Sequence, residues 1–261
     1  MFMECDTSAN APASLSDTNW PDTAVLSRRI SQSYYLPCRA AVEFAAALGL
    51  LIVTAPIIGL AALLVRLTSR GPAFYTQTRL GCGGQPYRIL KLRSMYHECE
   101  RHSGPRWSTA GDPRITPIGR FIRRTHIDEL PQLLNVLRGQ MSLIGPRPER
   151  PEFVPQFERM IPRYRERLLV RPGVTGFAQV QLPADTDLES VRRKLAYDLY
   201  YIGTANPWLD LRILLSTGLK VCGLSFPTLR KLFGMPTATQ VEGQYHRAML
   251  PAETVPEMQL A

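Results

Sequence analysis

The sequence predicts a mainly helical α+β protein in which an N-terminal membrane-embedded segment precedes a small domain. Three observations predict this class. Residues 40–65 are almost wholly apolar and long enough for a membrane helix. Leu130, Leu133, Leu134 and Leu137 fall on one face of a helix. Glycine turns separate short extended segments between residues 73 and 95.

Composition and charge favour anionic partners. The chain has 261 residues, a formal net charge of +9 and a pI near 9.6. Such a basic balance suits phosphates, nucleic acid or an anionic membrane surface. Neither end of the chain carries a sustained apolar period, so residues 1–37 and 233–261 are predicted to be disordered tails. Between them lie a membrane segment at 38–68 and a domain at 69–232.

The apolar run contains Pro56, with Arg39 before it and Arg66 and Arg70 after it. A proline inside the run should kink a helix. Arginines on both flanks give no preferred orientation under the positive-inside rule, which is satisfied best when both ends lie on the cytoplasmic side. The interpretation is a re-entrant helix–break–helix that dips into one leaflet and returns. An ordinary kinked span is the alternative.

Asp128 and Glu129 lie where a helix is expected to begin. Pro131 is tolerated only in a first turn, and Gly139 stands where the helix should stop. The free N–H groups of a helix start favour negative charge, so both carboxylates should stay ionised at neutral pH. Together they could bind Mg²⁺ through oxygen, and one could attack phosphorus. A simple helix cap is the alternative interpretation.

Basic side chains occur in the segments around this pair. Lys91 and Arg93 follow the Gly81–Gly84 turn, whose backbone N–H groups could approach a phosphate. Two prolines hold Arg147 in a stiff extended backbone, and a second turn presents Arg171. A guanidinium held in this way suits a phosphate. The alternative is that these are solvated surface side chains.

Further helices are expected on both sides of the carboxylate pair. One begins at Pro117 with a threonine cap, and a basic one over residues 155–170 could lie on anionic headgroups. Another spans 188–201 and carries three tyrosines, and the last runs over 208–224 behind Trp208. These aromatic side chains suit a membrane–water interface, and packing into the protein's own core is the alternative.

Several segments, taken together and in order, carry a resemblance. They are the apolar run with its proline, Ser69–Pro72, Arg79–Gly84, Lys91–Met95, Asp128–Gln132, Gly145–Glu149 and Arg171–Gly176. Over about residues 38–222 the chain resembles the bacterial sugar transferases, also called monotopic phosphoglycosyl transferases. It departs from them where Ala55 separates Thr54 from Pro56, where Glu43 replaces an aspartate and where Phe177 replaces a tryptophan.

The resemblance implies an activity and a location. Members transfer a sugar phosphate from a UDP-sugar to polyprenol phosphate, such as undecaprenyl phosphate, and release UMP. This reaction begins the assembly of exopolysaccharide, O-antigen or capsule at the cytoplasmic face of the bacterial inner membrane. The resemblance makes Asp128 the nucleophile of a covalent phosphosugar intermediate, with Mg²⁺ held by Glu129 and Asp128. The basic residues that it places near the substrate are Lys91, Arg93, Arg147 and Arg171.

Two other functions remain open from the residues themselves. A non-catalytic basic scaffold at the membrane surface would need the apolar run and the arginines but not Asp128. A Mg²⁺-dependent phosphohydrolase would use water in place of the lipid acceptor. Nucleic-acid binding is not expected, because aromatic side chains are not interleaved with the basic ones and no binding motif is present. A homodimer is left open.

Overall fold

The computed structural model describes residues 35–101, 104, 106–109 and 111–249. Of the disordered tail expected at residues 1–37, residues 1–34 lie outside the described part, and the expectation is wrong for residues 35–37, which form the start of a helix. The helices are α2 (Tyr35–Thr68), α3 (Pro117–Arg124), α4 (Leu133–Leu137), α5 (Val154–Met160), α6 (Leu188–Thr204), α7 (Pro207–Val221), α8 (Phe226–Leu232) and α9 (Ala238–Met249). Three 3₁₀ helices are η1 (Cys82–Gly84), η2 (Ile127–Gln132) and η3 (Tyr164–Leu169). The strands are β1 (Phe74–Leu80), β2 (Pro86–Leu92), β3 (Ser142–Ile144) and β4 (Gly173–Thr175), which confirms a mainly helical α+β fold.

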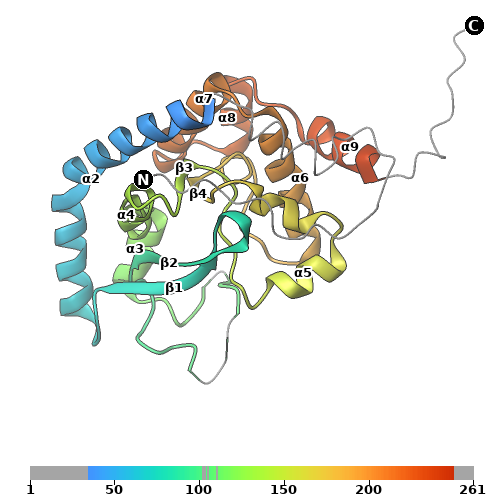
Figure 1. Cartoon of the computed structure of the whole chain (residues 1–261). Coiled ribbons are helices and arrows are strands. Elements are labelled where there is room, and N and C mark those ends of the chain that lie inside the picture. The colour runs from blue at the N-terminus through green and yellow to red at the C-terminus, as the bar shows by residue number, and fades with distance from the viewer. Residues whose placement is uncertain (1–34, 102–103, 105, 110, 250–261) are drawn as a thin grey trace, which may run out of the picture.

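Helix α2 is one unbroken helix with Pro56 inside it, and Figure 1 shows that it bends into two arms. The expected break is therefore a bend. The kink itself follows from the proline, which removes one hydrogen bond and crowds the preceding turn. Residues 38–68 of this helix are apolar enough to cross a membrane, and only 17% of its most apolar stretch is buried in the protein.

Both arms of α2 contact the same domain. On the first arm, the guanidinium of Arg39 bonds to Glu43, to the hydroxyl of Ser142 and to the carbonyl of Ile144, and it pairs with Asp210 at 3.2 Å. Ser142 in turn donates to Glu43 at 2.6 Å. This network is largely buried and fixes the first arm to β3 and α7.

On the second arm, Ala61 and Val65 are buried against Leu92 and Ile122. Ala47 on the first arm is also fully buried. Between Ala47 and Ile58, by contrast, every side chain of α2 is exposed or only partly covered. The bend of the helix is thus the part that packs least against the domain.

Two small sheets position the residues of interest. Strands β1 and β2 form an antiparallel hairpin in which Tyr75 pairs with Lys91. Strands β3 and β4 pair in parallel, with Ile144 opposite Thr175. The chain leaves β3 through Gly145, where an added Cβ would lie 2.4 Å from the carbonyl oxygen of Arg171. A glycine is required here because the two backbones approach too closely for any side chain.

The segment from α3 to α4 follows the sequence signals closely. Thr116 caps α3 by accepting a hydrogen bond from the N–H of Gly119 at 2.9 Å, and Gly139 has the left-handed φ of 72° expected at a helix stop. The predicted helix around Pro131 begins as the 3₁₀ helix η2 and becomes α-helical only at α4. Of its leucines, Leu133 is only 4% exposed and Leu137 packs partly buried against the core, whereas Leu130 and Leu134 are half-buried outside it, so the expected apolar face is confirmed in part.

The single basic helix expected over residues 155–170 is wrong. The segment forms α5 and then η3, and between them Ile161 is extended and Arg163 takes a positive φ of 62°. Pro162 explains the break, because it disfavours the helical backbone of the residue before it. Phe157 and Tyr164 are buried in the core, so this segment packs inside the domain instead of presenting one face to headgroups.

The predicted helices at 188–201 and 208–224 are confirmed as α6 and α7. The tyrosines of α6 do not lie at a membrane interface, because Tyr197 and Tyr201 are buried in the core. The tail expected to be disordered from residue 233 contains helix α9, which packs beside α6. Val241 and Tyr245 are buried there, four residues apart on one helix face, a spacing too short to stand out in the sequence. Residues 250–261 lie outside the described part.

Candidate active site

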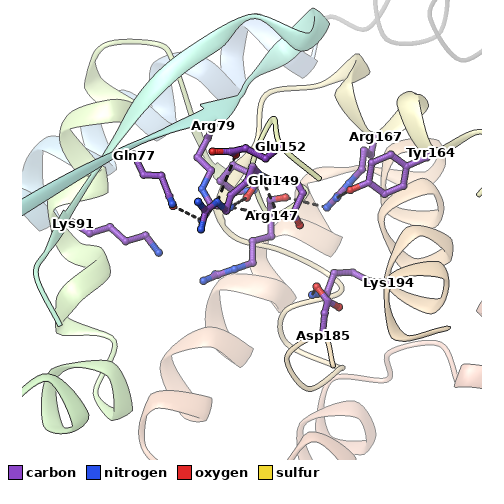
Figure 2. Close-up of polar contacts among 12 residues, drawn as sticks. Gln77, Arg79, Lys91, Arg147, Glu149, Glu152, Tyr164, Arg167, Asp185 and Lys194 are labelled. Carbon is purple, nitrogen blue, oxygen red and sulfur yellow. Dashed lines mark hydrogen bonds and ion pairs between the residues drawn. The ribbon is translucent and has the colours of Figure 1, made fainter. Parts of the chain in front are cut away.

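Three residues that are distant in sequence meet at the start of η2. Glu129 accepts hydrogen bonds from Lys91 on β2 and from Arg147 after β3, each at 2.8 Å and each to the same oxygen, Oε1. Lys91 and Glu129 are 19% and 12% exposed, whereas Arg147 is 42% exposed. Figure 2 shows Lys91 and Arg147 reaching toward one another from opposite sides. The partly open face of this cluster is therefore cationic.

The pKa values of the neighbouring carboxyl groups of Asp128 and Glu129 are shifted in opposite directions. Burial raises the pKa of Asp128 to about 6, and the charge of Glu129 adds to the rise. Burial also acts to raise the pKa of Glu129, but Arg147 and Lys91 outweigh it and hold that pKa well below its usual range. Both carboxylates are still expected to be ionised at neutral pH, because a pKa of about 6 leaves Asp128 mostly deprotonated at pH 7. The helix start does not, however, stabilise the anionic form of Asp128 as the sequence suggests. Burial, which the sequence does not show, outweighs the helix start.

Asp128 also differs from Glu129 in its partners. Asp128 is 8% exposed. Within the described part of the chain, its carboxylate makes no hydrogen bond and no ion pair, whereas that of Glu129 makes both. An anionic carboxylate without donors keeps its lone pairs free. Asp128 therefore has the more basic carboxylate, and no donor among the described residues occupies its oxygens. It suits attack on an electrophile better than Glu129 does.

The backbone at Arg147 is fixed by a hydrogen bond from a buried arginine of the domain. Its carbonyl oxygen accepts a hydrogen bond from Arg167 at 2.9 Å. Arg167 is buried and pairs with Asp198 at 2.8 Å and with the hydroxyl of Tyr164 at 2.7 Å. The flanking prolines restrict the backbone further. The sequence-based expectation that Arg147 is preorganised is consistent with this arrangement.

Arg93 does not join the cluster. Its guanidinium is 5% exposed and donates to the carbonyls of Ser69, Arg70 and Gly71, and to the hydroxyl of Ser69. Residues 91 and 93 point the same way on an extended strand, but β2 ends at Leu92. Arg93 therefore caps the turn that follows α2, where it satisfies carbonyl groups of that turn.

Replacing Arg93 with alanine should destabilise the protein by about 2–3 kcal/mol, because the charged hydrogen bonds to partly buried carbonyl groups of this turn are lost. Thermal unfolding of the detergent-solubilised protein would measure this. Arg88→Ala is the matched control, since Arg88 lies on β2 just before this segment and its side chain donates to Thr76 in an exposed position. If the variant instead bound a nucleotide sugar more weakly and kept the stability of wild type, Arg93 would be a substrate-binding residue.

The remaining predicted elements lie less close to the carboxylates. The half-buried Arg171 directly precedes Pro172 and β4, and its carbonyl packs on Gly145. The charges that act most strongly on Asp128 come from Glu129, Lys91, Arg123 and Arg147, and Arg171 is not among them. The glycine turn at 81–84 sits at the far end of the hairpin, about 20 Å along β2 from Lys91. It cannot cradle a phosphate at this carboxylate pair.

Sequence reasoning missed three residues near the site, two on the C-terminal helices and one in the loop before α6. Lys194 on α6 bonds to Asp185, and in Figure 2 this pair lies beside Arg147, on the side away from Lys91. Lys220 on α7 donates to the carbonyl of Gln179 at 2.7 Å, and its pKa is lowered by burial and by the charge of Arg147. Single lysines on amphipathic helices carry no pattern that marks them, so only the packing of α6 and α7 reveals them.

The carboxylate oxygens of Asp128 and Glu129 suit a magnesium ion that takes most of its other ligands from a bound phosphate substrate and from water. The described residues contain no group of three or more histidine, cysteine or acidic side chains that could hold a metal. Lys91 and Arg147 already occupy one oxygen of Glu129, which leaves its Oε2 and the carboxylate of Asp128 as donors. Mg²⁺ commonly takes one or two carboxylates and completes its shell with water and phosphate oxygens. Asp128 and Glu129 fit this coordination preference.

A carboxylate without hydrogen-bond partners among the described residues lies beside a cationic cluster, on a domain that carries a long apolar helix. This combination suits a class of protein that handles phosphorylated substrates at an apolar surface. The comparison with known families agrees with this class. The chain belongs to the bacterial sugar transferase family, whose profile matches residues 34–223.

Curated relatives can be aligned with the domain. A UDP-glucose:undecaprenyl-phosphate glucose-1-phosphate transferase of Caulobacter vibrioides is 50% identical over 167 residues, covering 62% of this chain and 61% of the relative. A UDP-N-acetylgalactosamine-undecaprenyl-phosphate N-acetylgalactosaminephosphotransferase of Aeromonas hydrophila is 46% identical over 162 residues, covering 62% and 38%. The exopolysaccharide production protein PSS of Rhizobium leguminosarum is 40% identical over 187 residues, covering 70% and 94%. The chain thus spans less than two thirds of the first two relatives.

Proposed function

We propose that this protein transfers a sugar 1-phosphate from a UDP-sugar to a polyprenol phosphate, with release of UMP. The observation that carries the proposal is the pairing of Glu129 with both Lys91 and Arg147 beside the unencumbered carboxylate of Asp128. The names of the relatives support the donor and the acceptor. Initiation of an exopolysaccharide, O-antigen or capsule repeat unit is the pathway role that fits this reaction.

The reaction proceeds in two displacements. A carboxylate oxygen of Asp128 attacks the phosphorus that bears the sugar. An oxygen–phosphorus bond to Asp128 forms while the bond to the leaving UMP oxygen breaks. A phosphate oxygen of the polyprenol phosphate then attacks the same phosphorus, and the carboxylate of Asp128 leaves. The product is a polyprenol diphosphate sugar, and Asp128 is regenerated.

The basic residues reduce the negative charge of the donor. Phosphoryl transfer depends mainly on positioning and on charge neutralisation. Arg147 offers a planar guanidinium suited to two phosphate oxygens, and Lys91 offers a compact charge beside it. Glu129 keeps both cations in place between turnovers. Mg²⁺ on Asp128 and Glu129, when bound, would polarise the phosphoryl oxygens further.

The membrane segment is best explained as re-entrant. A straight helix from Arg39 to Val65 would be about 39 Å long, more than the roughly 30 Å of the hydrocarbon core. A spanning helix would therefore place these two residues on opposite sides. Both ends instead pack on the same domain, and the bare part of α2 is the bend. This arrangement supports insertion of the bend into one leaflet from the cytoplasmic side.

Helix α7 would lie at the same membrane surface. Trp208, Leu211 and Leu215 are exposed on it, and they fall at the spacing of one helix face. Buried Leu209 and Ile213 cover its other side. An exposed apolar face with a tryptophan at one end suits the interfacial region of a bilayer. It extends the apolar surface that α2 presents.

Labelling of cysteines at the two ends of α2 should distinguish the re-entrant helix from a span. Native Cys38 and an engineered Thr68→Cys would each be tested alone, in a background whose other cysteines are replaced by serine. A membrane-impermeant maleimide is expected to label both positions in inverted vesicles and neither in intact spheroplasts. Labelling of the two positions from opposite sides would show a span and overturn the proposed topology.

The transferase is tested by UMP release from the full chain in detergent. Wild-type protein with Mg²⁺ would be given a panel of UDP-sugars, with and without undecaprenyl phosphate. Release that requires the lipid is expected for at least one sugar. Equal release without lipid would show a phosphohydrolase. No release from any sugar, by protein shown to be folded and given other nucleotide donors as well, would favour the scaffold.

A further inference from the structure

Asp185 and Lys194 form a buried ion pair at the edge of the candidate active site. Lys194 projects from α6, and Asp185 lies in the loop between β4 and α6. The lysine Nζ lies 2.5 Å from Oδ2 of Asp185, and the two side chains are 8% and 14% exposed. The second oxygen of Asp185, Oδ1, is buried and has no hydrogen-bond partner within the described residues. The lysine thus fixes the carboxylate and leaves one oxygen unused.

The pair lies within the electrostatic reach of the cationic cluster. The charges of Arg147 and Arg167 both lower the pKa of Lys194, after the larger effect of burial. Lys220, which lies near enough to Glu129 to be affected by its charge, is also affected by Lys194. In Figure 2, Arg147 lies between Lys91 and the Asp185–Lys194 pair. A substrate bound through its phosphates at Arg147 would therefore extend toward Asp185 on the far side.

The chemistry of Asp185 selects which part of a substrate it can meet. A carboxylate oxygen accepts hydrogen bonds and repels phosphate. A buried acceptor without a donor is costly, and such atoms in native proteins commonly have a functional explanation. The part of a nucleotide sugar that is neutral and rich in O–H or N–H donors is the hexose. Lysine and arginine side chains already surround the place where the diphosphate would bind, and none of them can accept a hydrogen bond.

We propose that Asp185 is a specificity-determining residue that accepts a hydrogen bond from one hydroxyl or amide of the donor sugar, with Lys194 as its positioning residue. This inference rests on the proposed transferase function and deepens it. A site built to accept a hydrogen bond rejects a substrate that lacks the donor, because its own polar group is then left unpaired.

The test is a coupling measurement between Asp185 and single hydroxyls of the sugar. The enzyme variants are wild type, Asp185→Ala and Asp185→Asn. The substrates are the preferred UDP-sugar and its mono-deoxy analogues, with undecaprenyl phosphate held constant. The alanine variant should lower kcat/KM for the preferred sugar by about 10- to 100-fold, the range of a charged hydrogen bond. For the analogue that lacks the bound donor, wild type and variant should have nearly equal kcat/KM.

Two comparisons keep the result interpretable. Asp185→Asn keeps the shape of the side chain and one acceptor oxygen for Lys194, but its amide nitrogen, which cannot accept a hydrogen bond, replaces the oxygen that faces the sugar. It should therefore fold normally and still lose the selectivity that the alanine variant loses. Glu189→Gln removes a nearby charge that is 63% exposed, and it should change neither activity nor selectivity. Thermal unfolding of each variant separates misfolding from altered recognition.

The proposal is overturned if Asp185→Ala lowers kcat/KM by the same factor for every sugar and every analogue, since a structural role acts on all donors alike. An effect confined to the KM for undecaprenyl phosphate would also overturn it. Failure of the proposed function has a different signature, because wild type itself would then show no lipid-dependent UMP release from any sugar.

Discussion

Replacing Asp128 with asparagine should lower lipid-dependent UMP release by about 10³-fold or more, the scale seen when a covalent nucleophile is removed. Asparagine has nearly the same shape, but its amide cannot form the acyl phosphate. Its neutral side chain also relieves the burial of charge that raises the pKa of Asp128 to about 6. The variant should therefore be folded and at least as stable as wild type, which separates loss of chemistry from loss of structure.

The same variant tests the covalent intermediate directly. Wild-type protein incubated with a donor labelled in its sugar, without lipid, and quenched in acid should retain label on the chain. Asp128→Asn should retain none. Glu158→Gln is a suitable control because Glu158 lies on α5 in the same domain, with only a weak ion pair to Arg165 at 3.9 Å. Label on the asparagine variant, or UMP release above a tenth of wild type, would mean that another group is the nucleophile.

Replacing Arg147 with alanine should lower kcat/KM for the UDP-sugar by about 10²–10³-fold, the effect typical of losing one preorganised electrostatic donor. Two changes act together. The diphosphate loses its guanidinium partner, and Glu129 loses one of the two cations that donate hydrogen bonds to its Oε1. The backbone should stay in place, because Arg167 bonds to the carbonyl of residue 147 and that contact survives the substitution.

Substitution of Arg147 by lysine distinguishes charge from geometry. Lysine retains the charge but cannot make two parallel hydrogen bonds, so most of the loss should remain. Arg165→Ala is the matched control, since its side chain is 67% exposed on η3 and should leave steady-state kinetics unchanged. Full activity of the lysine variant would show that Arg147 contributes only long-range charge. Its kcat/KM as a function of ionic strength would then report the screening.

Much of the local structure could be predicted because it depends on neighbouring residues. Pro56 inside an apolar run predicts a bent helix, and Thr116 followed by Pro117 predicts the start of α3. The left-handed backbone at Gly139 ends α4 as expected. Where a signal was short, prediction failed. Pro162 breaks the expected basic helix into α5 and η3, and two buried side chains of α9 hold a helix in a segment that composition marked as a tail.

The residue types at the candidate site were determined by sequence, whereas their association was decided by the tertiary structure. Adjacent carboxylates before Pro131 and an arginine between prolines are visible in the chain itself. Whether Lys91 or Arg93 reaches Glu129 depends on where β2 ends and on which groups its last residues meet. The unequal states of Asp128 and Glu129 depend on burial and on cations brought from β2 and from the segment after β3. Such interactions depend on distance in space, which only the packing of the whole chain sets.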